Sequence, residues 1–364
     1  MKIMKGRNTD IQNIAASSLA ILLLTAILVT GIYFMSRNNT IGIIGIITSV
    51  ILIIVLSVGL VIGIFLTKAG KSIMGFNFFS TLNGFSGDNS YTENSFDADD
   101  GKIRSIDIGW ACGNVEIKKS NDGSFSVSEE GDNDKYRMCW KVEGGKLSIR
   151  YSKNASLISA NLPKKTLILT LPDGFVPDRL DVKCASSQID ISGITAEKLN
   201  IDTASGKTYI SDSNVTECDI DSASGGVEVT ALKADSISVD TASGHTSFSD
   251  CECKTLKADS ASGGLSYNGK ADRIRCNSAS GGVELRLTEC PDSIDIDSMS
   301  GGTRIYLPAD SGFDVDIDSM SGKLDCSFDN IEMSKKHVSR KGNKIAKIDI
   351  DSMSGGVSII PIDG

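Results

Sequence analysis

Histidine, proline and aromatic residues are all scarce in this chain of 364 residues, and each shortage excludes something. Because the only histidines are His245 and His337, no Ser, His and Asp constellation for nucleophilic catalysis is visible. Aromatic residues make up 6% of the chain, while Gly, Ser and Asp crowd its C-terminal half, so a large irregular core is not expected. No proline lies from residue 178 to 290, as expected where strands donate hydrogen bonds on both sides.

Positive charge is also in short supply beyond the N-terminal segment. Residues 72–364 hold 31 basic and 45 acidic residues, which gives a net charge of −14. Phosphate binding needs clustered Lys and Arg, so we predict that nucleic acid is not a partner.

The nine cysteines do not form a disulfide framework. Their number is odd and their spacing irregular, which is typical of a reducing compartment, although a role as small buried residues would also explain them. Cys251-x-Cys253 has no matching second pair, so a structural role is favoured over half of a metal site.

Charged residues of either sign are missing from two long runs near the N-terminus. After a basic N-terminal tail, residues 1–13, the run at 14–35 can span about 30 Å of hydrocarbon as a helix of roughly 20 residues. A second uncharged run, residues 41–67, is long enough to cross again after a short turn. We therefore predict a two-helix transmembrane hairpin that anchors the chain in the lipid bilayer. A secretory signal peptide fits less well, because the first run exceeds the usual apolar length of about 7 to 15 residues.

Basic residues flank this hairpin unevenly. Three lie in the N-terminal tail, two follow the second run and one lies in the turn. Because Lys and Arg are retained on the cytoplasmic side, this distribution predicts that residues 72–364 lie in the cytoplasm. The segment 72–101 is interpreted as a linker between the membrane and the rest of the chain.

A single unit recurs after residue 180 with a period of about 19–20 residues. The copy CDIDSASGGVEV at 218–229 consists of two short apolar/polar alternations joined by a Ser-Gly corner. Ile220, Val227 and Val229 would face inward and the residues between them outward, as in a sheet with one buried face. The structural corners are Ser205, Gly206, Ser224, Gly225, Ser243, Gly244, Ser262, Gly263, Ser280, Gly281, Ser300, Gly301, Ser321, Gly322, Ser354 and Gly355.

This repeat predicts an all-β fold, a right-handed parallel β-solenoid (β-helix) with one coil per unit. Coils stacked about 4.8 Å apart would satisfy each other's backbone hydrogen bonds, so nearest neighbours would supply the stability. We place the solenoid repeats at 181–364, with an inserted loop at 327–344, and interpret residues 102–180 as an N-terminal β cap region. The strands expected in the cap are 138–142, 146–151 and 166–171.

Two columns of equivalent positions stand out across the repeats. The acidic column holds Asp202, Asp221, Asp240, Asp259, Asn277, Asp297, Asp318 and Asp351. We favour hydrogen bonds from the backbone of each following corner to these Asp side chains, and the alternative is a row of cation sites of the kind that calcium takes. In the second column Ala changes to Met at positions 299, 320 and 353. We favour a packing change, either a wider corner or packing against the inserted loop, and the alternative is an exposed patch for a partner.

The D-[ST]-[AM]-S-G-[GKH] corner and the strand ends Leu171-Pro172, Leu307-Pro308 and Ile360-Pro361 resemble the bacterial putative-adhesin family of β-strand repeats. The resemblance covers residues 102–364. It implies a membrane-anchored domain of unknown function with a binding or scaffold role, in some members beside cell-envelope stress systems, and it brings no catalytic residues. It also implies repeats outside the cell, whereas the two spans and basic flanks of this chain depart from the family's usual single span.

These observations predict no enzyme and no cofactor. Our first hypothesis is a membrane-anchored, adhesin-like β-solenoid that serves as a binding surface at the cell envelope for an unknown protein or envelope partner. The alternative is a cytoplasmic, membrane-bound scaffold that polymerises end to end and is similar to bactofilins. An enzyme that acts on envelope glycans is the third hypothesis, disfavoured because these coils lack long loop insertions.

Overall fold

The computed structural model describes residues 85–93, 95–96, 100–131, 134–153 and 162–362. The predicted membrane hairpin, at 14–35 and 41–67, lies outside these residues. Among the helices of the described ranges, none is long and apolar enough to cross a membrane.

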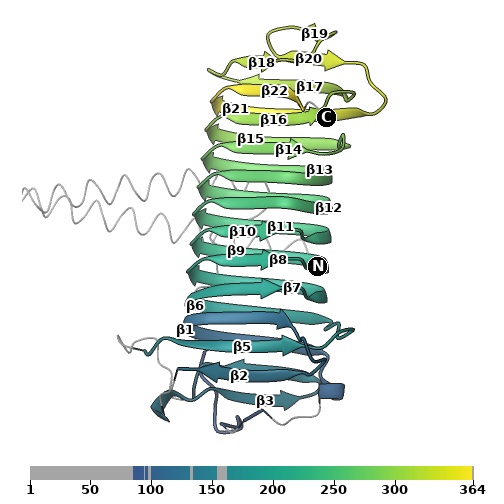
Figure 1. Ribbon diagram of the computed structural model, residues 1–364. Coiled ribbons are helices and arrows are strands. Elements are labelled where there is room, and N and C mark those ends of the chain that lie inside the picture. Colours follow the sequence, from purple (N-terminus) through teal and green to yellow (C-terminus); the bar gives the residue numbers. More distant parts are fainter. Residues whose placement is uncertain (1–84, 94, 97–99, 132–133, 154–161, 363–364) are drawn as a thin grey trace, which may run out of the picture. The chain divides into compact units, whose positions relative to one another are not determined.

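The described residues form an all-β fold in which the strands of stacked coils pair in parallel (Figure 1). The N-terminal part contains η2 (Asp100–Lys102), β1 (Ser105–Lys119), β2 (Ser126–Glu130), η3 (Asp134–Tyr136), β3 (Cys139–Glu143), β4 (Lys146–Arg150) and β5 (Lys165–Leu171). The middle contains β6 (Arg179–Ser192), β7 (Thr195–Ser205), β8 (Thr208–Ser211), β9 (Asn214–Ser224), β10 (Val227–Thr230), β11 (Lys233–Ser243), β12 (Thr246–Ser262), β13 (Leu265–Ser280) and β14 (Val283–Leu287). The C-terminal part contains β15 (Ser293–Ser300), β16 (Thr303–Pro308), β17 (Gly312–Ser319), β18 (Leu324–Cys326), β19 (Glu332–Met333), β20 (His337–Arg340), β21 (Ile345–Ser354) and β22 (Val357–Ile362).

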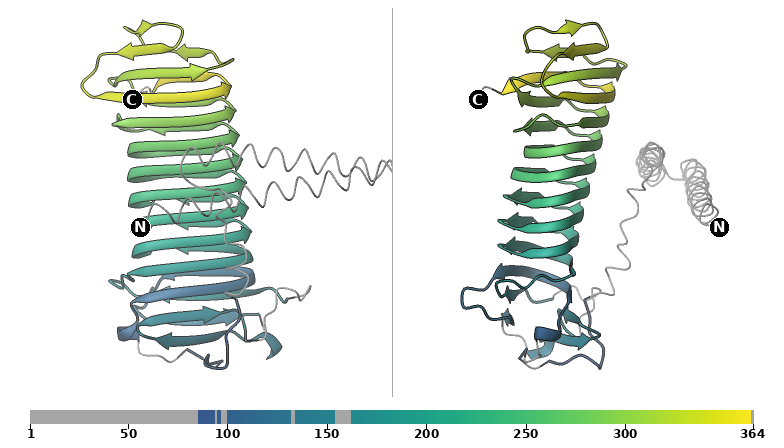
Figure 2. Two further views of the ribbon diagram at one scale, coloured as in Figure 1. Left: turned by 180° about the vertical axis from the view of Figure 1, so that it is seen from behind. Right: turned by 90° about the vertical axis from the view of Figure 1, so that its right-hand side faces the viewer.

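Successive coils of the middle part are in register along their length (Figure 2). Leu199 pairs with Cys218 and Cys218 pairs with Ile237, so each residue lies beside its equivalent 19 positions away. The parallel register and this spacing confirm the predicted β-solenoid and its period.

The interior of the coils is apolar. Ile220, Val227 and Val229 are each at most 1% exposed. Asp219, which precedes Ile220, and Glu228, which lies between the two valines, face outward. The predicted alternation is therefore confirmed. Because the apolar side chains of one coil pack on the equivalent side chains of the next, a coil is stable only as part of the stack.

Glycine is required at the Ser-Gly corner because the backbones of adjacent coils approach closely there. Gly301 has a φ of +136°, and a Cβ on it would lie 2.2 Å from the carbonyl oxygen of Gly281 in the adjacent coil. On its other side, the Gly301 N–H donates to the carbonyl oxygen of Ser354 at 3.3 Å. The corners thus form a continuous hydrogen-bonded column that leaves no space for a side chain.

The coils do not stack in chain order at the C-terminal end. β15 pairs with β21, and β21 pairs with β17, so the last coil of the sequence lies between two coils that precede it. The corner glycines follow this order, since a Cβ at Gly355 would lie 2.0 Å from the Gly301 oxygen and one at Gly322 would lie 2.1 Å from the Gly355 oxygen. The segment 327–344, predicted as an inserted loop, contains β19 and β20, and β20 pairs antiparallel with β17.

The N-terminal end is closed by antiparallel strands. β4 and β5 continue the parallel stack on β1, while β3 pairs antiparallel with β4 and β2 with β5. The bounds of β3, β4 and β5 confirm the three strands expected in the cap. Phe85 is 1% exposed and the Gly87 N–H donates to the Ser152 carbonyl at 3.1 Å, so the described part of the segment 72–101 is bonded to the cap.

Candidate functional site

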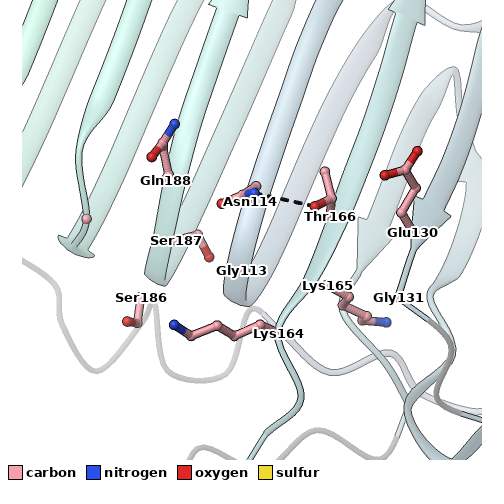
Figure 3. Close-up of a pocket in the computed structure, with 11 residues that line it drawn as sticks. Gly113, Asn114, Glu130, Gly131, Lys164, Lys165, Thr166, Ser186, Ser187 and Gln188 are labelled. Carbon is pink, nitrogen blue, oxygen red and sulfur yellow. Dashed lines mark hydrogen bonds between the residues drawn. The ribbon is translucent and has the colours of Figure 1, made fainter.

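A polar pocket of about 450 Å³ lies where the cap meets the first coils. Figure 3 shows Asn114 of β1, Thr166 of β5, Ser187 of β6 and Lys164, which precedes β5, around this pocket. The Asn114 amide donates to the Thr166 hydroxyl at 3.5 Å. Among the described residues that line this pocket there is neither histidine nor cysteine, so it contains no pair of nucleophile and imidazole base.

Lys165 lies at the edge of this pocket, but its ammonium group is bonded to residues of the cap. Its ammonium donates to Glu129 Oε2 and to the Tyr151 carbonyl, both at 2.6 Å, and to the Tyr136 carbonyl. It also lies 4.8 Å from the ring centroid of Trp110. Burial lowers the pKa of Lys165, against the opposing effect of the Glu129 carboxylate. Because all three ammonium donors are engaged, this side chain serves as a structural tie rather than a free amine nucleophile.

The structure places the predicted acidic column in one row on the outer face of the coils. Asp202 pairs with Asp221, Asp221 with Asp240, and Asp240 with Asp259. Asn277 continues the row, and its amide donates to Asp259 Oδ1 at 2.6 Å. The row then runs through Asp297, Asp351 and Asp318, in the spatial order of the coils.

Burial and mutual repulsion shift the acidities of this column. Burial, together with the neighbouring carboxylates of Asp240 and Asp202, raises the pKa of Asp221 to about 7. Burial also raises the pKa of Asp202, which shares a hydrogen bond with Asp221. The pKa of Asp297 is raised by burial and by the charges beside it. A protonated Asp221 that donates to Asp202 would therefore relieve part of the repulsion within the row.

In three coils a hydrogen bond within the corner comes from the serine that follows the acidic-column position. Ser260 and Ser278 each donate to the carbonyl oxygen of the glycine three residues later, at 3.2 Å, and Ser222 does so at 3.5 Å. These serines point inward, so the corner is held from the inside, and the Asp side chains stand on the opposite face of the strand. In the described part of the chain, no group of three or more His, Cys, Asp or Glu side chains is arranged to hold a metal ion.

Two of the three methionines in the methionine column are exposed, and Met299 is half-buried. Met320 is 83% exposed and Met353 is 46% exposed, so packing against the segment 327–344 does not account for them. The exposure of these two side chains agrees with the alternative of an exposed patch, and its role for a partner stays a prediction.

These methionines complete a regular arrangement that we call the C-terminal grid. In each of β15, β21 and the region of β17, two aspartates and a methionine alternate on the outer face of one coil. The grid consists of Asp295, Asp297 and Met299, then Asp349, Asp351 and Met353, then Asp316, Asp318 and Met320. Sequence reasoning found two of these columns separately but missed the aspartate column two residues earlier, although the period of two would have placed it on the same face.

The nine cysteines are all free, and six of them are buried. Burial raises the pKa of the Cys184 thiol to about 12, which suppresses its reactivity. Cys251 and Cys253 both face the interior, and Cys253 Sγ lies 3.5 Å from the Tyr267 hydroxyl. This pair has a packing role in the core.

A protein-family model described as Toastrack DUF4097 matches residues 103–360. Among solved structures, the chain is similar to a putative adhesin from Bacteroides fragilis, at 16% identity and a TM-score of 0.42, over 76% of this chain and 100% of that chain. It is also similar to a putative lipid binding protein from Parabacteroides distasonis, at 16% identity and a TM-score of 0.46, over 75% of this chain and 98% of that chain. A search of the curated proteins gives no match.

Proposed function

The chain belongs to the Toastrack DUF4097 family, and on this premise we propose that it is a non-enzymatic binding protein of the bacterial cell envelope. In this proposal, residues 14–35 and 41–67 anchor it in the membrane. The observation that carries the proposal is the continuous outer face of the stacked strands, where polar columns end in the C-terminal grid. Because the coil interior is filled by apolar side chains, the outer face is the part that can meet a partner.

The resemblance to putative-adhesin repeats supports a binding role, and it supports placing this protein beside cell-envelope stress systems. The chemistry of the described residues gives little support to catalysis. Lys165, the most buried amine at the pocket, has its donors engaged, and the acids of the outer face stand in rows rather than in opposed pairs across a cleft.

The alternative of an end-to-end scaffold is less well supported by the two ends of the stack. Adding another solenoid requires a long open parallel edge, yet antiparallel β3 and β2 lie outside β4 and β5, and antiparallel β20 lies outside β17. The three-residue β18, which pairs only with β22 among the described strands, leaves a short parallel edge unpaired. We therefore expect the full chain, purified in neutral detergent, to sediment as one species and to show no filaments in electron micrographs. Filaments that lengthen with protein concentration would overturn the binding proposal in favour of the scaffold.

Which side of the membrane the solenoid occupies follows, in this proposal, from the basic flanks of the hairpin. Native cysteines cannot report it, because they are buried or half-buried, so an exposed reporter is needed. Met320→Cys, at a position 83% exposed, should react with a membrane-impermeant thiol reagent only after the membrane is opened. Asn38→Cys, in the predicted turn, should react in intact cells.

The unsubstituted chain supplies the background labelling for this experiment. Labelling of Met320→Cys in intact cells would contradict the charge distribution and would place the binding surface outside the cell, as the family resemblance implies. It would leave the binding role intact but change the set of partners that can reach it.

A further inference from the structure

We propose that the C-terminal grid binds a cationic, partly apolar segment of a partner protein. Lys or Arg side chains of the partner would lie on the two aspartate columns, and an apolar side chain would lie on the methionine column. This inference rests on the proposed binding function and names the class of partner.

The charge of the grid is poorly neutralised by the chain itself. Lys336 pairs with Asp318 at 2.6 Å and Arg275 pairs with Asp295 at 3.7 Å, but all four side chains are more than 40% exposed. Ion pairs as exposed as these contribute little. His337 lies 3.0 Å from Asp316. In the central coil of the grid, neither Asp349 nor Asp351 has an ion-pair partner among the described residues. A cationic partner would therefore meet carboxylates that are still available.

The methionine column gives the grid an apolar border that the other coils lack. The equivalent position is Ala in the middle coils, as at Ala223 and Ala242, and it becomes Met only in the three coils of the grid. A long, flexible thioether that is 83% exposed at Met320 buries little of its own surface in the free protein. Methionine is common on binding surfaces because it adapts its shape to a partner.

The geometry of the grid sets the pattern that a partner must present. Along a strand the three outward positions are separated by two residues each, and neighbouring coils repeat them about 4.8 Å away. An extended segment with two cations and then an apolar residue on one face matches one row. A flat sheet face of this kind is met by side chains rather than by insertion into a cleft.

Two other occupants fit less well. A divalent cation is disfavoured, because no three metal-binding side chains are suitably arranged in the described residues. A second copy of the chain is disfavoured at low salt, because residues 72–364 carry a net charge of −14 and like-charged bodies repel.

The test uses the full chain in neutral detergent and a fluorescent synthetic peptide that repeats Lys-Thr-Lys-Thr-Leu-Thr. We expect the grid variant Asp349→Asn/Asp351→Asn to weaken peptide binding by about tenfold. The matched control, Asp219→Asn/Glu228→Gln, removes two outward carboxylates from a coil that has Ala223 instead of Met. It should weaken binding by no more than about twofold.

A third variant separates the apolar column from the charge. Met353→Ala introduces the residue that the middle coils carry, so the fold should be kept, and we expect about fivefold weaker binding of the Leu peptide. A comparison peptide with Ser in place of Leu should bind more weakly than the Leu peptide and be insensitive to Met353→Ala.

Equal weakening by the grid variant and the matched control would overturn the proposal, because binding would then follow net charge alone. Self-association that is lost only in the grid variant, without peptide binding, would also overturn it and would make a second copy the occupant. Neither result would count against a binding role for the protein, which fails instead if the chain forms filaments.

Discussion

Replacing Gly301 by Ala should destabilise the solenoid by about 3 kcal/mol, one of the larger losses that a single added methyl group can cause. The new Cβ would lie 2.2 Å from the Gly281 carbonyl oxygen, and the residue would be held at a φ of +136°. Neither problem can be relieved by moving a side chain, because the obstructing atom belongs to the backbone of the adjacent coil. Circular dichroism of the full chain during thermal unfolding would measure the loss as a lower Tm.

The adjacent glycine provides the control for this prediction. A Cβ at Gly302 would lie 3.7 Å from the Gly356 oxygen, its nearest neighbour outside the adjacent residues, and this is an ordinary van der Waals distance. Gly302→Ala should therefore leave the Tm unchanged or slightly higher, since Ala restricts the unfolded chain. Equal effects of the two substitutions would show that close approach at the corner does not determine stability.

The regular parts of this fold were predictable because the same pattern of inward, outward and corner residues recurs in every repeat. The inward Ile220 and Val227, the outward Asp219 and the corner glycines each recur at one period, so one coil defined the others. The cap strands were predictable for a different reason, because short alternations between turn residues indicate β structure without any repeat.

The order of the last coils was not predictable from the same pattern. The unit at 315–326 could stack on the unit at 294–305 as well as the unit at 348–359 does, since all three carry the same Asp, Ser and Gly positions. The order of these coils depends on β20, which pairs antiparallel with β17 and places His337 opposite Asp316. The segment that contains β20 has no repeat. The local pattern therefore predicts each coil but not the coil on which it stacks.

For the candidate site residues too, the repeat predicts position, whereas burial and acidity depend on neighbours in space. Membership of Asp221 in the acidic column followed from the period alone, whereas its raised pKa depends on burial and on the spatial neighbours of the column. Exposure of Met320 depends on what the segment 327–344 covers, and that segment has no repeat from which to infer it.

The solenoid should be more stable in mild acid than at alkaline pH, with Asp221 as the principal cause. Its pKa of about 7 in the folded chain lies above the ordinary 3.8, because burial and the charges of Asp240 and Asp202 disfavour ionisation. Folding therefore takes up a proton between about pH 4 and pH 7. The contribution of this proton uptake to the free energy of unfolding is fully present below about pH 4 and is lost as the pH rises through about 7. The Tm of the full chain should be higher at pH 5 than at pH 8.

Asp221→Asn should reduce this pH dependence and raise the free energy of unfolding at pH 8 by about 1 kcal/mol, a value reduced from the full pKa shift because the group is partly exposed. The chain itself contains the precedent, since Asn277 occupies the same column and donates to Asp259 at 2.6 Å. Asp219→Asn is the matched control on the same strand, and it should not stabilise the fold, because the Asp219 carboxylate is paired with Lys198 at 2.8 Å.

A wild-type Tm that rises from pH 5 to pH 8 would mean that something other than protons relieves the charge repulsion in the acidic column. A bound cation would be the first candidate, and addition of a chelator at pH 8 would then lower the Tm.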